Sequence, residues 1–252
     1  MMTKRIGILG AMPEEIKGIV SLLKEKVEIV KGMRTYYIGI INDVEVVVVF
    51  SRWGKVASAT TVTHLIVEFG ITHLYFTGVA GAINPMLKIG DIVIADSLVQ
   101  HDLDARPLMK QFEIPLLGKT MLCPPKEMLD IAVESINELM INGDLVNLLS
   151  PKEQQKFSLH KPKLIVGQIA SGDQFFANGL EKENLIKILP EVLCVEMEGA
   201  AVAQVCYEYA IPYVIVRTIS DSANENSATD FNEFVIEVAS KFGVAIIQKL
   251  VK

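Results

Sequence analysis

The sequence has few cysteines, and their spacing excludes a disulfide framework. Only three cysteines occur among 252 residues, and no two of them form a CxxC pair. Cys194 and Cys206 lie inside apolar runs, where a thiol usually behaves as a small packing side chain. We therefore expect these two cysteines to be buried and free, and we expect no metal site built on them.

The sequence also lacks basic runs and long apolar runs. Its 24 basic and 30 acidic residues give a net charge of -6, and no cluster of Lys and Arg marks a nucleic-acid surface. The longest uncharged apolar runs, such as residues 46–50, have the length of a strand and cannot span a bilayer. Pro13 and Glu14 interrupt the first apolar stretch too early for a signal peptide. We expect a soluble cytoplasmic protein without a nucleic-acid or membrane partner.

The composition that remains is typical of a globular enzyme. Half of the residues are apolar and about a fifth are charged. A chain of this length is close to the upper limit for one hydrophobic core, so we expect a single domain over residues 1–252. Residues 7–10 read GILG and do not continue as GxGxxG, which disfavours a dinucleotide-dependent dehydrogenase.

Strand-like apolar runs alternate with helical segments, which predicts an α/β fold with a mixed central sheet flanked by helices. Strands are expected at residues 6–9, 36–41, 44–50, 72–77, 91–99, 164–170, 192–195 and 213–219. Helices are expected at residues 13–23, 55–69, 127–140, 198–209 and 230–251. A hairpin turn at Asn42-Asp43, a glycine-containing turn at residues 78–82 and a polar surface excursion at residues 142–163 complete the prediction.

Polar and glycine-rich segments follow several of the expected strands. Ligand sites of open α/β sheets collect at the carboxyl ends of the strands. Residues that are far apart in the sequence can therefore meet in one crevice. These segments are residues 12–15, 78–81, 173–176, 197–198 and 220–221.

Together the motifs resemble the 5′-methylthioadenosine/S-adenosylhomocysteine nucleosidase family, which has a nucleoside phosphorylase-like fold. They are GILGAMPEE (7–15), GVAGAINPMLKIGD (78–91), QHDLDA (100–105), SGDQFF (171–176), VEMEGAAVAQVC (195–206) and RTISDSA (217–223). The resemblance runs in family order over nearly the whole chain. It implies a homodimer that hydrolyses methylthioadenosine, S-adenosylhomocysteine and 5′-deoxyadenosine without a metal or a cofactor.

Glu15 resembles the carboxylate with which the family activates water. Its position in the first turn of a predicted helix favours the ionised form, and an ionised carboxylate can accept a proton from an attacking water. Taken alone, local sequence favours Glu14 and Glu15 as acids that only decorate a helix N-terminus; the GILGAM motif around them favours the catalytic interpretation.

Asp221 resembles the acid that protonates N7 of the departing adenine. That role requires a carboxyl whose pKa burial raises. The alternative is a turn carboxylate after a strand. Ser220 is then its turn partner, whereas in the catalytic interpretation Ser220 orients the acid.

Glu198 is expected to accept hydrogen bonds from the ribose 2′- and 3′-hydroxyls. A buried acceptor left unpaired by a missing hydroxyl makes such a site reject deoxyribose. Glu196 is the competing, less favoured candidate, and Met197 between them is expected to lie against the sugar. Val79 stands where some relatives have a serine near the sugar, so that hydroxyl is missing here. Gly81 is the remaining substrate-binding residue expected in the same glycine-containing segment.

The aromatic residues are expected to hold the base and the 5′-substituent. Phe175 resembles the ring that stacks on adenine, and Phe176 offers its backbone to the base edge; by composition alone such a pair is more often core. Met12, Trp53 and Phe231 are expected to line the 5′-pocket, where a polarizable Met suits a thioether. The family usually has a smaller aliphatic residue near Trp53.

Two further residues of the chain, His101 and Asp104, resemble a family segment near the dimer contact and the pocket mouth. We interpret them as structural and not as metal ligands.

The sequence leaves other functions open. A phosphate-dependent nucleoside phosphorylase needs cations around its anion; residues 11–15 supply acids instead, although Arg52 and Arg217 keep the alternative open. Use of aminodeoxyfutalosine is a second alternative. A non-catalytic adenosine-binding protein is a third, because a fold alone does not establish chemistry.

Overall fold

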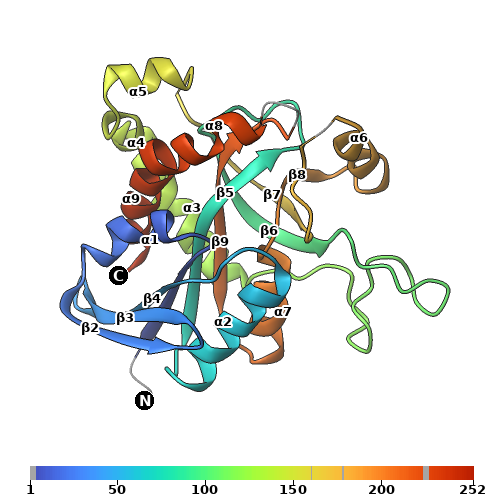
Figure 1. The fold of residues 1–252 in the computed structure, drawn as a ribbon, viewed down its shortest axis with the longest axis horizontal. Helices are drawn as coiled ribbons and strands as arrows, with labels where there is room; N and C mark the ends of the chain where they lie inside the picture. Colours follow the sequence, from blue (N-terminus) through green and yellow to red (C-terminus); the bar gives the residue numbers. More distant parts are fainter. Residues whose placement is uncertain (1–3, 160, 178, 224–226) are drawn as a thin grey trace.

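The computed structural model describes residues 4–159, 161–177, 179–223 and 227–252. In this part of the chain nine strands form one mixed sheet in the order β2-β3-β4-β1-β5-β8-β7-β6-β9 (Figure 1). The strands are β1 (Arg5–Gly10), β2 (Lys24–Lys31), β3 (Arg34–Ile41), β4 (Val44–Phe50), β5 (His73–Ala82), β6 (Ile92–Gln100), β7 (Leu164–Ser171), β8 (Val192–Glu196) and β9 (Tyr213–Asp221).

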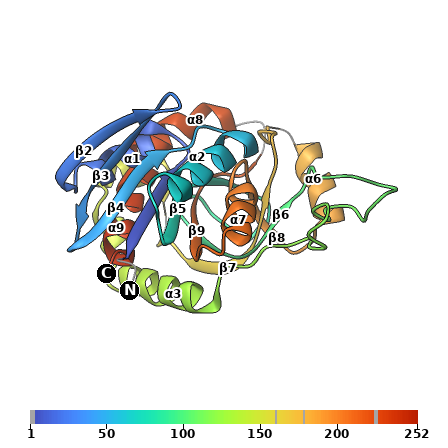
Figure 2. The same cartoon turned by 90° about the horizontal axis from the view of Figure 1, so that it is seen from below.

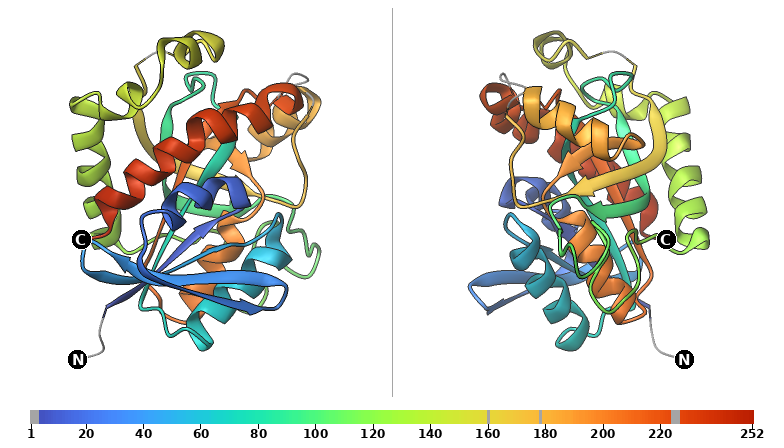
Figure 3. Two further views of the ribbon diagram at one scale, coloured as in Figure 1. Left: turned by 60° about the vertical axis from the view of Figure 1, so that its left-hand side comes forward. Right: turned by 90° about the vertical axis from the view of Figure 1, so that its right-hand side faces the viewer.

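Helices cover both faces of this sheet. They are α1 (Pro13–Val20), α2 (Lys55–Val67), α3 (Lys126–Ile141), α4 (Asp144–Asn147), α5 (Pro151–Lys156), α6 (Gly179–Ile188), α7 (Gly199–Glu208), α8 (Ser227–Phe234) and α9 (Ser240–Leu250), with a π-helical turn η1 (Val235–Ala239) between the last two. Figures 1 and 2 show α2 and α7 together, apart from α3 and α9. In Figure 3 the α8–η1–α9 segment runs beside α1.

The second half of the sheet closes on itself. Strand β9 pairs in parallel with β5 and antiparallel with β6, while β8 joins β5 to β7. Strands β1 and β5 are parallel neighbours, so the ends of β1, β5 and β9 meet on one side. This arrangement brings the polar segments that follow those strands to the same place.

Most of the expected elements are present, and the hairpin turn has positive φ at both Asn42 (48°) and Asp43 (63°), as a type I′ turn requires. The turn predicted at residues 78–82 is wrong. Strand β5 continues to Ala82, because residues 74–81 pair with β9 and Gly81 also pairs with Val195 of β8.

Two elements have no counterpart in the sequence prediction, and one segment was misjudged. Strand β2 is a largely exposed edge strand with many charges, and α6 has only one buried residue, Leu185. The supposed surface excursion at residues 142–163 contains α4 and α5, and it buries Leu145, Leu149 and Phe157 in the core. Cys194 and Cys206 are buried and free, as expected.

No helix in the described ranges combines the length and the apolar character needed to cross a membrane.

Candidate active site

One cavity of about 330 Å³ lies where β1, β5, β8 and β9 end. Its volume falls in the range of small-molecule sites. The cavity is lined by all twelve residues that the sequence singled out as catalytic or substrate-binding. These are Met12, Glu15, Trp53, Val79, Gly81, Phe175, Phe176, Met197, Glu198, Ser220, Asp221 and Phe231.

Glu15 enters the cavity from the start of α1. Strand β1 ends at Gly10 and Pro13 opens the helix, so Glu15 occupies the third helical position. Its Oε2 atom accepts hydrogen bonds from the backbone N–H groups of Ala11 (2.6 Å) and Met12 (3.0 Å). The carboxyl thus caps its own helix, and its orientation is fixed by the backbone.

The other oxygen of Glu15 is available for chemistry. Oε1 is buried and has no hydrogen-bond partner of good geometry within the described residues, although the Val79 N–H acts on the carboxyl closely enough to lower its pKa. A Cβ atom on Gly78 would lie 3.1 Å from this oxygen, so a glycine there lets the strand approach the carboxyl closely. A buried acceptor without a protein partner requires an explanation, and a catalytic role is one.

The electrostatics of Glu15 differ from the expectation that its helix position keeps it ionised. Burial raises the pKa of Glu15 to about 7, against the lowering effects of the Arg217 charge and of backbone amides. The amides do bind the carboxyl, but the loss of hydration outweighs them. Near pH 7 the protonated and ionised forms therefore coexist, which suits a group that accepts a proton during a reaction.

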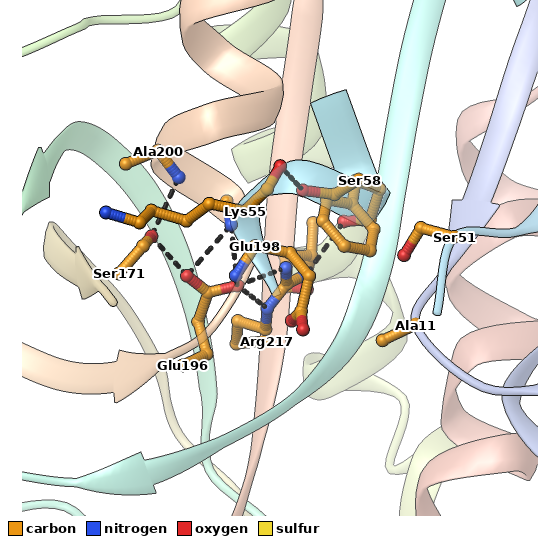
Figure 4. A network of polar contacts seen from close by, with 12 residues as sticks. Ala11, Ser51, Lys55, Ser58, Ser171, Glu196, Glu198, Ala200 and Arg217 are labelled. Carbon is orange, nitrogen blue, oxygen red and sulfur yellow. Dashed lines mark hydrogen bonds and ion pairs between the residues drawn. The ribbon is translucent and has the colours of Figure 1, made fainter. Parts of the chain in front are cut away.

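Glu196 is a buried acid of a different kind. Arg217 approaches its Oε2 atom with Nη2 (2.6 Å) and Nε (3.2 Å), and the Gly199 N–H donates to both oxygens. The Ser171 hydroxyl donates to Oε1, and the guanidinium stacks 3.9 Å from the Phe76 ring centre. Figure 4 shows Glu196 at the centre of these contacts. With all of its partners provided by the protein, Glu196 holds β7, β8, β9 and α7 together.

Glu198 lies immediately before α7 and faces the cavity. It is 5% exposed and accepts a hydrogen bond from the Gly54 N–H (2.8 Å). Burial, and secondarily the charge of Glu196, raises the pKa of Glu198. Gly54 has a φ of 92°, and a Cβ atom there would come within 2.9 Å of Asp173. The hydrogen bond from residue 54 to Glu198 therefore requires a glycine at that position.

Asp221 ends β9 and lines the same cavity. Its Oδ2 accepts a hydrogen bond from the Ser220 hydroxyl (2.7 Å) and its Oδ1 from the Ala223 N–H (2.8 Å). The Ser220 hydroxyl also lies 3.4 Å from the Ala80 carbonyl, so it can donate to that carbonyl and accept a hydrogen bond from the Asp221 carboxyl when that group carries a proton. A Cβ atom on Gly81 would lie 3.1 Å from Oδ1. Glycine at this position gives the acid room.

Aromatic side chains frame the opening of the cavity. Phe175 is 43% exposed and meets Phe231 edge to face at 5.8 Å between ring centres. Phe176 is buried and packs edge-on against His101 at 5.3 Å. Trp53 is 60% exposed at the rim. Phe175 is thus accessible to a planar ligand, whereas the Phe176 ring belongs to the core.

The charged lining of the cavity is predominantly acidic. Among the described lining residues four are acids and one, Arg217, is a base that is already paired with Glu196. No set of three or more His, Cys, Asp or Glu side chains in the described part of the chain is arranged to hold a metal ion. Asp104 pairs with Arg106, a surface ion pair that fits its structural interpretation.

The sequence does not identify every residue that lines the cavity. It suggests Arg217 only as a phosphate ligand, and it does not point to Gln174 or Asn232. Arg217 is 1% exposed in a strand that is buried throughout. A lone cation in such an apolar run requires a buried partner, which could have indicated the pair with Glu196.

Comparisons with known proteins identify the family of the chain. The model of the phosphorylase superfamily matches residues 5–252. An aminodeoxyfutalosine nucleosidase of Campylobacter jejuni is 36% identical over 98% of this chain and 99% of its own. A 5′-methylthioadenosine/S-adenosylhomocysteine nucleosidase of Staphylococcus aureus is 34% identical over 93% of each chain.

Solved structures show the same likeness. A futalosine hydrolase of Helicobacter pylori superimposes with a TM-score of 0.84 at 34% identity, covering 99% of this chain and 98% of its own. The methylthioadenosine/S-adenosylhomocysteine nucleosidase of Streptococcus pneumoniae, solved with a transition-state inhibitor, has a TM-score of 0.83 at 34% identity and covers 98% of both chains. The chain therefore belongs to the phosphorylase superfamily and, within it, to the nucleosidases, the enzymes that hydrolyse N-glycosidic bonds.

Proposed function

We propose that this nucleosidase hydrolyses 5′-methylthioadenosine and S-adenosylhomocysteine, and also 5′-deoxyadenosine, to adenine and the 5′-substituted ribose. The observation that carries the proposal is the pair of acids on one cavity, Glu15 with a free buried oxygen and Asp221 held by Ser220. Relatives named for the first two substrates support it.

The expected reaction begins with loosening of the bond between the base and the sugar. Asp221 gives a proton to N7 of adenine, which makes the base a better leaving group, while Phe175 stacks on it. Glu198 accepts hydrogen bonds from the ribose hydroxyls and holds an oxocarbenium-like sugar. Water that has given its proton to Glu15 then attacks the anomeric carbon from the opposite face, with inversion of configuration.

Water is favoured over phosphate as the nucleophile. A dianion in this cavity would meet four acids and a single base whose charge Glu196 already balances. Arg52, the other candidate phosphate ligand, does not line this cavity within the described residues.

Adenine release from methylthioadenosine in phosphate-free buffer tests the proposal. We expect release at a rate that added phosphate does not change, with free methylthioribose as the second product. Strict dependence on phosphate, with a sugar phosphate as product, would establish a phosphorylase instead.

Aminodeoxyfutalosine is the second candidate substrate, because relatives named for it reach 36% identity over almost the whole chain. It shares the adenine and ribose that Asp221, Phe175 and Glu198 are proposed to hold. Values of kcat/KM for the four nucleosides, measured with one enzyme preparation, would rank them.

We also propose a homodimer. Large apolar side chains are exposed at Trp53 on the cavity rim, at Val56 in α2, and at Leu108 and Leu116. The last two belong to the 101–125 segment, which projects from the rest of the molecule in Figure 1. Exposed apolar groups of this kind are typical of an interface. Light scattering should give twice the mass of one chain.

A further inference from the structure

A second cavity of about 690 Å³ adjoins the active-site cavity. The two share Ala11, Met12, Trp53 and Asn232 as lining residues. Met12 and Trp53 are the residues expected around the 5′-substituent. A substituent longer than methylthio would therefore continue from the first cavity into the second.

The second cavity carries one cation, Arg52, on the loop between β4 and α2. The buried Arg34 fixes the backbone around this loop, because its Nη2 atom donates to the carbonyls of Ser51 and Ala57 (3.2 Å each). Arg52 itself has a φ of 72°, a conformation that favours glycine. Its backbone position is thus imposed by the loop.

The Arg52 guanidinium is anchored but not saturated. Nη2 donates to the Met33 carbonyl at 2.7 Å, and this is its one hydrogen bond to the described residues. Four of the five N–H groups of an arginine remain for a ligand after one such bond. A guanidinium held at one end can bind a carboxylate with its remaining N–H groups.

The same cavity carries one anion, Glu14, at the start of α1. Glu14 is exposed and makes no hydrogen bond or ion pair with the described residues. A ligand with a carboxylate alone would gain from Arg52 and be repelled by Glu14. A ligand with a carboxylate and an ammonium group would gain from both.

We propose that this second cavity binds the zwitterionic α-amino-acid end of a 5′-thioether substituent, with Arg52 on the carboxylate and Glu14 on the ammonium group. The inference rests on the proposed nucleoside hydrolysis and deepens it. Arg52 and Glu14 would then determine specificity for S-adenosylhomocysteine. Methylthioadenosine lacks the amino-acid end and would make neither contact.

The test compares substrates that differ only in the charged end. Values of kcat/KM are measured for S-adenosylhomocysteine, its analogue without the amino group, its analogue without the carboxylate, and methylthioadenosine. For an exposed charge-assisted contact, R52Q should lower kcat/KM for S-adenosylhomocysteine about fivefold and E14Q about threefold. In R52Q the analogue without the carboxylate should have the same kcat/KM as S-adenosylhomocysteine. In E14Q the same should hold for the analogue without the amino group.

Matched controls separate this specific effect from general ones. K126Q and E134Q make the same charge changes on α3, and their substrate ratios should equal those of the wild type. Unchanged ratios in R52Q and E14Q, or an equal loss on methylthioadenosine, would overturn the second-cavity proposal while hydrolysis stands. A wild-type enzyme that cleaves none of the nucleosides would refute the proposed function itself, and the proposal with it.

Discussion

Glu196 and Glu15 are both buried acids on the wall of one cavity, but their surroundings are opposite. Glu196 receives hydrogen bonds from Arg217, Ser171 and the Gly199 amide on both of its oxygens. Glu15 has both of its backbone hydrogen bonds on Oε2, and Oε1 has no partner within the described residues. The saturated acid stabilises the fold, whereas the burial of the unsaturated acid is destabilising and marks Glu15 as a candidate catalytic group.

Loss of Asp221 is expected to have the largest effect on turnover, matched only by loss of Glu15. D221N keeps acceptor and donor groups near Ser220 and Ala223 but cannot give a proton to adenine. Loss of a general acid should lower kcat on methylthioadenosine by about 10²- to 10⁴-fold. Steady-state adenine release measures this, with circular dichroism as the folding control; a rate close to that of the wild type would remove Asp221 from the mechanism.

Replacing the saturated acid should affect stability instead. E196Q leaves the buried Arg217 without its counter-charge, which should cost about 3–5 kcal/mol in the free energy of unfolding. Urea denaturation measures that free energy. E198Q is the matched control, since the Gln carbonyl can still accept from Gly54, and it should unfold close to the wild type. Equal losses in the two variants would contradict the assigned difference between these neighbouring acids.

A third prediction uses the pH dependence of stability. The pKa of Glu15 is about 7 in the native state and near its ordinary value of 4.5 in the unfolded chain. Between these values the native state holds more protons, so the contribution of Glu15 to stability falls as the pH rises. The side chain at position 15 cannot ionise in E15Q. The free energy of unfolding of E15Q, relative to that of the wild type, should therefore increase from pH 4.5 to 8.

That gain should approach about 3 kcal/mol at the alkaline end. Parallel denaturation curves of the two proteins at several pH values measure it. A difference that is constant with pH would show that the native pKa of Glu15 is not raised.

The features that could be predicted from the sequence are those that depend on short motifs and on the ends of strands. Gly10 and Pro13 mark the end of a strand and the start of a helix, and the strand-end rule correctly brings Glu15, Glu198 and Asp221 to one cavity. The glycines within residues 78–82 predict a turn. The pairing of these residues with β8 and β9 makes them a strand.

What could not be predicted depends on contacts between distant segments. Strand β2 lacks an apolar run and exists through its pairing with β3. The pKa of Glu15 reverses the local expectation, because the helix start favours ionisation while burial by other elements opposes it more strongly. The pairing of Glu196 with Arg217 likewise joins residues 21 positions apart.

Turnover of methylthioadenosine by E15Q directly tests whether Glu15 activates the attacking water. The Gln carbonyl can keep the hydrogen bonds from Ala11 and Met12, so the helix start should persist while proton acceptance is lost. We expect kcat to fall by about 10²- to 10⁴-fold in a protein that is at least as stable as the wild type at pH 7. A rate near that of the wild type would contradict the role of the free Glu15 oxygen in activating water.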